Sequence, residues 1–362
     1  MKKVAIIGGG PAGAITALVL ARLKFDVVLL EAAAGPFQKI GKCLSPNILP
    51  LLRKLELQDL LITGHKQSYG NRAIWGSDQI RDHDFISSVY GEGTHINRQQ
   101  FEDSLAQEAR KAGVDWRYNF SAGNVERGDQ QWIITAKDKQ INEPIIADFL
   151  VDASGRRAFV GRSLGAKREH IDNLVGVTAI LDDCKLKDSF TLIEAVESGW
   201  WYSAGLPNDR LVISFMTDSF LVKEMEVNKP EVWLKMVQEL TFTKHRIGDI
   251  KVEALKLEVK QASSSRLQFI TGQDWLCVGD AACTYDPLSS YGITAAMGSA
   301  YYAGCAISDH LNGNNDALQA YTFLMDKMYS NYLTMVQEAY FAEQRWPKSI
   351  FWKRRHANFF PN

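Results

Sequence analysis

The stretch that decides the fold is VAIIGGGPAG at residues 4–13, which is followed by the helix-forming run AITALVLA at residues 14–21. A short apolar, partly β-branched run before the glycines is typical of a parallel strand that is buried on both faces. A second apolar run, VVLL at residues 27–30, ends in Glu31. The order of strand, glycine turn, helix and strand predicts the start of an α/β domain with a parallel sheet.

Each part of this G-x-G-x-x-G segment has a physical role in binding an adenine dinucleotide. Gly8 permits the tight turn, Gly10 lets the backbone approach a pyrophosphate, and Gly13 lets the helix pack closely on the strand. The helix N-terminus offers free N–H groups to phosphate oxygens, and Glu31 is placed to accept hydrogen bonds from a ribose diol. The alternative is a glycine-rich turn without a ligand, and the fingerprint alone leaves NAD and FAD both open.

A second segment late in the chain bears on that choice. WLCVGDAA at residues 275–282 predicts another buried strand that ends near Asp280, and DPLSSYGITAA at residues 286–296 predicts a turn and then a helix from Gly292. An Asp at a strand end can hold a sugar-like diol, and a helix N-terminus can stabilise negative charge that develops on a ring. By themselves these residues are equally compatible with a tight joint between a strand and a helix.

Taken together, the two segments resemble the FAD-dependent monooxygenases of the hydroxybenzoate-hydroxylase fold. The resemblance implies that Asp280 binds the ribityl chain of FAD and that Arg98, in THINR at residues 94–98, lies near the flavin and its phosphates. LVDASGR at residues 150–156 resembles a third fingerprint of the same family. The other cofactor contacts that the resemblance implies, besides Gly8, Gly10, Gly13 and Glu31, are Pro11, Ala12, Val125, Pro287, Gly292 and Ile293.

Three further stretches resemble a narrower group, the tryptophan-halogenase-like flavoproteins. They are GKCLSP at residues 41–46, SYGN with WGS within residues 68–77, which includes Trp75, and GWWYSAGLP at residues 199–207. A C-terminal pattern of EQRWP and FWKRR within residues 343–355 resembles flavoproteins that accompany quinone-cofactor oxidases of the lysine ε-oxidase and glycine oxidase types. This resemblance implies a monooxygenase that hydroxylates a tryptophan side chain of a precursor oxidase during cysteine tryptophylquinone formation. Electrons would come from NAD(P)H or a separate reductase, because there is no second dinucleotide fingerprint.

Two other functions stay open, an FAD-bearing assembly partner without oxygenase turnover and a hydroxylase of small aromatic molecules. Halogenation is less favoured, because Tyr202 and Ala204 interrupt the W-x-W-x-I-P signature of halogenases and Lys66 is the only nearby candidate for their lysine. No catalytic residue is assigned. The candidates are Lys66, Trp75 and Cys43, with Cys43 near the flavin if its segment docks as in the family. His65 and His95 are possible proton carriers, although lone histidines are more often structural.

Amino-acid composition excludes several other classes of protein. Of 362 residues, 46% are hydrophobic and 23% are charged, which is ordinary for a globular chain with a core and excludes a disordered protein. The formal net charge of −1 gives no overall attraction to nucleic acid. The five cysteines show neither C-x-x-C nor metal-ligand spacing, so reduced thiols, a cytoplasmic location and no metal site are expected. No apolar run is long enough for a membrane span or a signal peptide.

The sequence thus predicts an α/β fold: an FAD-binding Rossmann-like parallel-sheet domain, an inserted antiparallel-sheet substrate domain, and a C-terminal helix. Helical spacing of apolar residues supports the last element over residues 317–340. Its basic and aromatic tail is either pinned to the body, a surface for a partner protein, or a weak membrane contact. The expected boundaries are 1–68, 96–172 and 262–316 for the FAD-binding domain, 69–95 and 173–261 for the substrate-side sheet, and 317–362 for the helix and tail.

Overall fold

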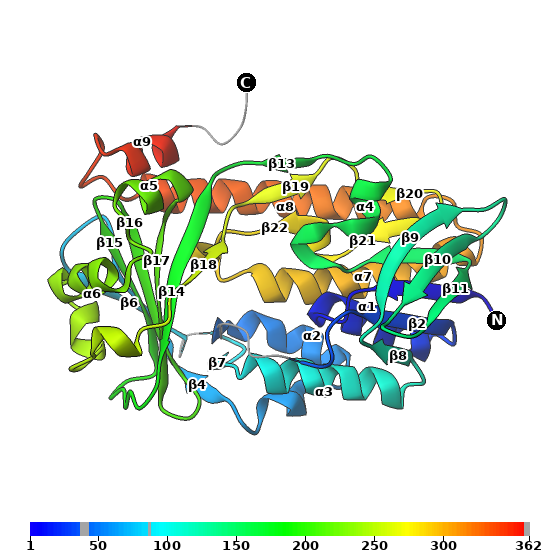
Figure 1. Ribbon diagram of the computed structural model, residues 1–362, viewed down its shortest axis with the longest axis horizontal. Helices are drawn as coiled ribbons and strands as arrows, with labels where there is room; N and C mark the ends of the chain where they lie inside the picture. The colour runs from blue at the N-terminus through cyan, green and yellow to red at the C-terminus, as the bar shows by residue number, and fades with distance from the viewer. Residues whose placement is uncertain (37–42, 86–87, 358–362) are drawn as a thin grey trace.

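The computed structural model describes residues 1–36, 43–85 and 88–357. Two large sheets lie at opposite ends of the molecule, and long helices run between them (Figure 1). The N-terminus lies at the end that holds the parallel sheet. Residues 358–362, the end of the expected tail, lie outside the described residues.

The parallel sheet is built around the glycine-rich segment and confirms the predicted α/β class. β1 is its third strand from one edge and is buried along most of its length, so apolar residues occupy both faces. All neighbouring pairs are parallel except β20 with β21. The strand order is β20 (Thr271–Gly272), β21 (Trp275–Cys277), β12 (Phe149–Asp152), β1 (Lys3–Ile7), β2 (Asp26–Glu31) and β8 (Asp115–Tyr118).

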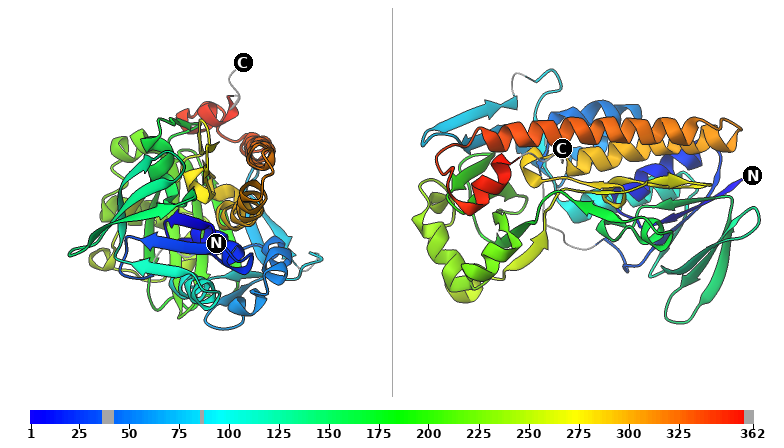
Figure 2. Two further views of the ribbon diagram at one scale, coloured as in Figure 1. Left: turned by 90° about the vertical axis from the view of Figure 1, so that its right-hand side faces the viewer. Right: turned by 90° about the horizontal axis from the view of Figure 1, so that it is seen from above.

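Four helices pack against this sheet and against one another. α1 contacts α3 and α7, and α7 contacts α8, which runs beside it along the length of the molecule (Figure 2). Asn97 caps α3, because its side chain accepts a hydrogen bond from the N–H of Gln100. The start of α7 at Gly292 and the long helix after residue 317 agree with the sequence. The bounds are α1 (Pro11–Arg22), α3 (Arg98–Lys111), α7 (Gly292–Leu311) and α8 (Ala317–Phe341).

The second large sheet has seven strands and is antiparallel apart from one pair. β5 and β15 run parallel, which the sequence did not predict, because β5 enters the sheet from a distant part of the chain. α6 (Pro230–Glu239) covers one face, where Trp233 Nε1 donates to the carbonyl of Val177. The strand order is β18 (Glu258–Gln261), β14 (Leu174–Leu181), β17 (Arg210–Asp218), β16 (Gly199–Leu206), β15 (Phe190–Val196), β5 (Gly70–Ile74) and β6 (Ile80–Asp84).

Smaller elements complete the two ends and join them. The chain crosses between the large sheets along a ribbon in which β13 leads into β14 and β18 leads into β19. Three small sheets contain β9 (Ser121–Arg127), β10 (Trp132–Lys137) and β11 (Asn142–Ala147); β13 (Arg168–His170), β19 (Ser265–Leu267) and β22 (Cys283–Thr284); and β3 (Cys43–Leu44), β4 (Lys66–Ser68) and β7 (Gly93–His95). The short helices are α2 (Leu49–Lys54), α4 (Phe159–Ser163), α5 (Ser219–Glu224) and α9 (Ile350–His356).

The C-terminal segment packs onto the body through α9. Phe351 and Trp352 are fully buried, and Trp352 Nε1 donates to the carbonyl of Val196 at 2.9 Å. Arg355 is 1% exposed and pairs with the buried carboxylate of Asp218 at 2.8 Å. Three hypotheses were open for this tail: packing on its own protein, a surface for a partner, or a weak membrane contact. The described part of the tail packs on its own protein. Within the described residues, no helix is both long and apolar enough to cross a membrane.

Candidate active site

The glycine turn between β1 and α1 is closed on one side and open on the other. A Cβ atom on Gly8, whose φ is +110°, would lie 2.3 Å from the carbonyl oxygen of Ala153, and one on Gly13 would lie 1.9 Å from that of Gly8. A Cβ on Gly10 would meet no atom within 4 Å. The turn therefore keeps free space in front of Gly10 and the first N–H groups of α1, which begins at Pro11.

Glu31 is fixed beside this turn at the end of β2. Its carboxylate accepts hydrogen bonds from the N–H of Gly9 at 2.6 Å and from the N–H of Ala33 at 2.8 Å. These two bonds orient the carboxylate toward a small cavity of about 40 Å³ that Glu102 and Tyr118 also line. The Glu31 carboxylate is thus a hydrogen-bond acceptor on one side of the open glycine turn, where the dinucleotide hypothesis needs one for the ribose diol.

Arg98 lies near this region, whereas Val125 belongs to the small sheet of β9 and β10. Arg98 is the first residue of α3 and donates from Nε to Glu102 Oε1 at 3.0 Å, so it is held next to the cavity that Glu31 lines. Val125 is 7% exposed and pairs with Ile134 across β9 and β10. Glu102 was missed by sequence reasoning, because its position one turn after Arg98 is equally typical of a surface ion pair.

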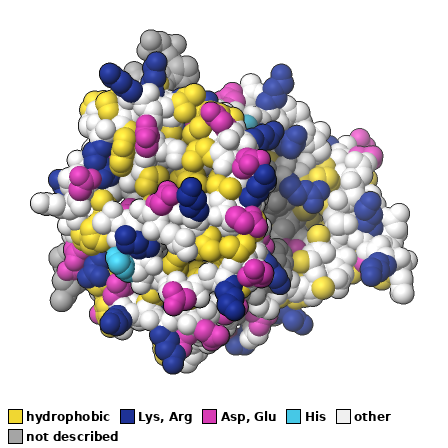
Figure 3. Space-filling view, turned by 60° about the vertical axis from the view of Figure 1, so that its left-hand side comes forward, with side chains coloured by type: hydrophobic (Ala, Val, Ile, Leu, Met, Phe, Trp, Pro, Cys, Tyr) yellow, Lys and Arg dark blue, Asp and Glu magenta, His cyan; other side chains and the backbone are white. Residues whose placement is uncertain are grey.

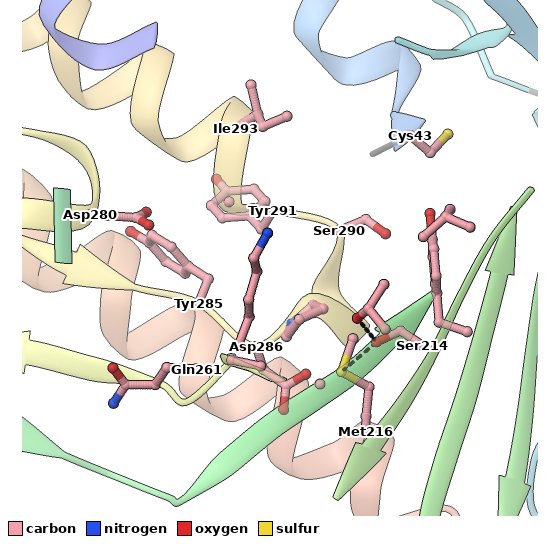
Figure 4. A pocket seen from close by; sticks show the side chains of 18 of the residues that line it. Cys43, Ser214, Met216, Gln261, Asp280, Tyr285, Asp286, Ser290, Tyr291 and Ile293 are labelled. Atoms are coloured by element: carbon pink, nitrogen blue, oxygen red, sulfur yellow. Dashed lines mark hydrogen bonds between the residues drawn. The ribbon is translucent and has the colours of Figure 1, made fainter. Parts of the chain in front are cut away.

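A larger cavity of about 340 Å³ lies between the parallel-sheet end and the seven-stranded sheet. It brings together residues from segments that are far apart in sequence: Asp280 and Tyr285 line one side and Cys43 the other, with Ser290 and Tyr291 between them (Figure 4). Its lining also includes Pro287, Gly292 and Ile293 from the cofactor prediction and Thr178, Tyr202, Ser214 and Met216 from the sheet.

Asp280 is positioned in this cavity by two arginines. Arg168 donates to the backbone carbonyls of Asp280 and Ala281 at 3.0 and 2.8 Å, which fixes the turn after β21. Arg156 Nε lies 3.7 Å from Asp280 Oδ2, and the Asp280 side chain stays 40% exposed. Gly279, with a φ of +56°, packs so closely on Ala12 that a Cβ there would approach it to 2.8 Å. This contact brings the two fingerprints of the sequence side by side.

The start of α7 supplies backbone donors that the helix itself does not use, at the same cavity. The first helical bond is from the N–H of Ala295 to the carbonyl of Tyr291, so the N–H groups of Gly292, Ile293 and Thr294 have no partner within the helix. Gly292 and Ile293 line the cavity. A helix of 20 residues therefore directs its positive end toward the space beside Asp280.

The floor of the cavity contains a buried carboxyl that the sequence analysis did not single out. Asp286 is 2% exposed, and its Oδ2 accepts a hydrogen bond from the Tyr340 hydroxyl at 2.7 Å. Burial first, and the neighbouring carboxylate of Asp172 second, raise the pKa of Asp286 to about 7. The group thus titrates near neutral pH. The Asp-Pro sequence was the available signal, but its partner Tyr340 comes from a distant helix.

Cys43 lines the cavity as a neutral thiol. Its Sγ donates to the Ser68 hydroxyl at 3.2 Å, and burial raises the pKa of the thiol. A thiol that stays protonated is a poor nucleophile. Cys43 therefore contributes a small, weakly polar surface there, and its role in catalysis remains a hypothesis.

Lys66 and His65 lie on a different, more open cavity of about 850 Å³. His65 accepts a hydrogen bond from the N–H of Asn97, and its Nε2 lies 3.0 Å from the carbonyl of Leu60. His95 is fully buried and contacts the Thr191 hydroxyl at 3.2 Å. Burial first, and the charge of Lys66 second, lower the pKa of His95 to about 4. A neutral, buried imidazole fits a structural role.

Trp75 belongs to an aromatic cluster rather than to the cavity. Its Nε1 donates to the carbonyl of Ala339 at 2.7 Å, and its ring lies 5.3 Å from that of Trp352 and 5.9 Å from that of Tyr340. These contacts join the end of β5 to α8 and α9. Among the described residues, no group of three His, Cys, Asp or Glu side chains could hold a metal ion.

The geometry fits a bound FAD. Gly10, Glu31 and the N-terminus of α1 form an open cradle at one end, and Asp280 with the N-terminus of α7 faces the larger cavity at the other. The comparisons with known proteins agree: residues 1–324 match the FAD binding domain family, and the chain belongs to that family. The predictions of an FAD cofactor and of an FAD-dependent oxidoreductase are confirmed.

The chain is similar to individual known proteins along most of its length. Over 357 residues the chain is 32% identical to the putative FAD-dependent oxidoreductase LodB of Marinomonas mediterranea, covering 97% of this chain and 96% of that protein. It is 22% identical to the tryptophan 2-halogenase of Chondromyces crocatus, covering 97% and 70%. Among solved structures, the peptidyl tryptophan dihydroxylase QhpG, described as essential for tryptophylquinone cofactor biogenesis, has the same fold with a TM-score of 0.82, 23% identity, and coverage of 98% and 78%.

Proposed function

We propose that the protein hydroxylates a tryptophan side chain of a precursor protein during formation of a tryptophylquinone cofactor. The observation that carries this proposal is the cavity of about 340 Å³, in which Asp280 and the start of α7 face an apolar wall from the seven-stranded sheet. Tyr202, Val212 and Met216 belong to that wall. An aromatic side chain placed between the two sides would lie against the cofactor and be shielded from water.

The chain's own residues position the reactants, and the chemistry comes from the cofactor. When bound and reduced, FAD supplies the electrons that activate O₂. The N–H groups of Gly292 and Ile293, which have no partner within α7, would stabilise negative charge at the edge of the ring, and Asp280 would hold hydroxyl groups of the ribityl chain. A protonated Asp286 carboxyl at the floor is able to donate a proton near pH 7, while Tyr340 holds its Oδ2 in place.

Two comparisons support the choice of substrate. LodB matches this chain over nearly the full length of both proteins. QhpG, which shares the fold, is described as a peptidyl tryptophan dihydroxylase. A tryptophan within a polypeptide is therefore the substrate class that we infer, with the precursor of a quinone-cofactor oxidase as the protein that carries it.

The test is oxygen incorporation by the FAD-loaded protein. The purified protein is given a precursor oxidase, or a tryptophan-containing peptide from one, under ¹⁸O₂, and the product is analysed by mass spectrometry. We expect label on the tryptophan ring and none in a matched peptide that has Phe in its place. Separate reactions with NADH, NADPH and a flavin reductase identify the electron source. Reoxidation of the flavin with no labelled product contradicts the oxygenase and favours an assembly partner without turnover.

Halogenation is the second candidate, because the chain resembles the tryptophan 2-halogenase. The same reactions run with chloride or bromide distinguish it, since a halogenated ring has a characteristic isotope pattern. We expect none, because Lys66 lines a separate cavity from the one that contains Asp280. Free indole and phenol, tested in parallel, distinguish a hydroxylase of small aromatic molecules.

A further inference from the structure

One edge of the seven-stranded sheet is open beside the cavity. β18 is the edge strand, its four residues are all exposed, and Val259 is 50% exposed. Just after β18, the N–H of Ala262 donates to the carbonyl of Leu174 at 2.9 Å. Hydrogen-bonded positions alternate in an antiparallel pair, so Lys260 bonds to β14 while the N–H and C=O groups of Val259 and Gln261 face outward. Such an edge can accept another extended chain.

This edge lies at the cavity itself. Lys260, Gln261 and Ala262, at and just beyond the end of β18, line the same cavity as Asp280. A chain added along β18 would have alternate side chains on each face of the sheet. One of them would therefore reach the opening of the cavity, whereas free tryptophan would gain nothing from the strand.

A basic groove adjoins the same opening. It has a volume of about 530 Å³, and its described lining residues include no Asp or Glu. Arg156 and Gln261 line both the groove and the cavity, so the two lie next to each other. Figure 3 shows a hollow in this face with Lys and Arg side chains around it. The basic residues of the groove are Arg156, Arg162, Lys167 and Arg168, with His170 beside them.

Two cations of the groove are available to bind a ligand. Arg162 and Lys167 are exposed and make no ion pair with any residue that the structure describes. The chain as a whole carries a net charge of −1, so this concentration of cations is local. Complementary charge accelerates association and selects partners, and it favours an occupant rich in Asp and Glu.

We propose that an acidic, extended segment of the protein substrate docks along β18, with its carboxylates in the basic groove and one side chain in the cavity. The identity of that side chain as tryptophan rests on the proposed function. Backbone hydrogen bonds to Val259 and Gln261 align the segment, and Arg162 and Lys167 bind its acidic residues. The cavity thereby receives a residue within a chain, not a free amino acid.

The probe is a short fluorescein-labelled peptide with one tryptophan, Thr and Val around it, and a run of Glu at one end. Its binding to the FAD-loaded protein is measured by fluorescence anisotropy at several salt concentrations. Val259→Pro removes one outward N–H from an edge position, where proline is tolerated, and we expect binding about tenfold weaker. Val259→Thr keeps the N–H and should bind like the unaltered protein.

The groove is tested by the double variant Arg162→Glu with Lys167→Glu. We expect binding to weaken by about tenfold or more and to lose most of its salt dependence. The matched control reverses two exposed charges at the far end of the molecule, Lys137→Glu with Lys139→Glu, and should leave binding unchanged. FAD content and melting temperature establish that each variant is folded.

The outcomes separate this inference from the proposed function. Equal binding by Val259→Pro, equal binding by the Arg162 and Lys167 variant, or no binding of the acidic peptide by the unaltered protein each overturns the docking site. Oxygen incorporation is measured separately. A peptide that binds as expected without being oxygenated removes the proposed function and leaves the docking site standing. A peptide oxygenated equally well by all variants leaves the function standing and overturns the site.

Discussion

The Tyr340 hydroxyl donates to Asp286 Oδ2 at 2.7 Å and also accepts a hydrogen bond from Trp200 Nε1 at 3.0 Å. Tyr340 is fully buried near the end of α8, and Asp286 is on the floor of the cavity. One hydroxyl therefore connects the C-terminal helix, the seven-stranded sheet and the candidate active site. The hydroxyl of a second tyrosine of α8, Tyr332, accepts a hydrogen bond from the backbone N–H of Asp286 at 2.6 Å.

Tyr340→Phe is expected to destabilise the protein by about 1–3 kcal/mol, because it removes the hydroxyl that hydrogen-bonds to both Asp286 Oδ2 and Trp200 Nε1 at a buried site. Denaturant unfolding of the FAD-loaded protein measures the change. Tyr302→Phe is the control, since Tyr302 is 48% exposed on α7. Equal stability of the two variants would show that the buried network contributes nothing.

Asp286 should make stability depend on pH. Its pKa in the folded protein is about 7, above the ordinary value of 3.8, because burial and Asp172 disfavour its charged form. Between these two values the folded state holds a proton that the unfolded chain has lost. The contribution of Asp286 to the free energy of unfolding is therefore greatest at low pH and falls as the pH rises toward 7.

Asp286→Asn removes this titration and keeps a side chain of similar shape. We expect the difference in melting temperature between the variant and the unaltered protein to change between pH 5 and pH 8, with the variant gaining relative stability as the pH rises. Parallel curves over this range would contradict the assignment. Arg355 and Asp172, whose charges act on Asp286, are present in both proteins.

The parts of the fold that the sequence predicted are those set by local patterns. The strand before Gly8, the helix after it and the start of α7 at Gly292 follow from apolar periodicity and glycine placement over a few residues. Helical spacing likewise identified α8, because its buried positions recur every three or four residues.

The parts that the sequence missed depend on contacts between distant segments. The sequence near Asp286 does not predict its hydrogen bond with Tyr340, which is 54 residues away. Likewise, the sequence near β5 does not predict its parallel pairing with β15. Trp75 was considered a catalytic candidate from a resemblance of its segment, whereas its ring packs against α8 and α9. Cofactor contacts at Glu31, Arg98 and Asp280 remain predictions that ligand binding must test.

Gly10 and Gly13 should respond differently to alanine. Gly10 has extended backbone and open space around its Cβ position, so Gly10→Ala should leave the fold of the apoprotein intact and weaken FAD binding by about tenfold or more. Gly13→Ala places a methyl group 1.9 Å from the carbonyl of Gly8 and should cost about 1–3 kcal/mol or more of stability. FAD titration and apoprotein melting measure the two effects. Unchanged FAD affinity of Gly10→Ala would place the pyrophosphate elsewhere.

Trp352→Ala tests whether the C-terminal segment is part of the folded body. The Trp352 ring is fully buried, contacts Trp75 and Tyr340, and donates to Val196, so its removal leaves a cavity. We expect a loss of about 3–5 kcal/mol in unfolding free energy. Lys353→Ala, at the exposed neighbouring position, should change stability by less than about 0.5 kcal/mol. If Trp352→Ala instead unfolds like the unaltered protein, α9 is not held on the body in solution, and its aromatic residues become available to a partner.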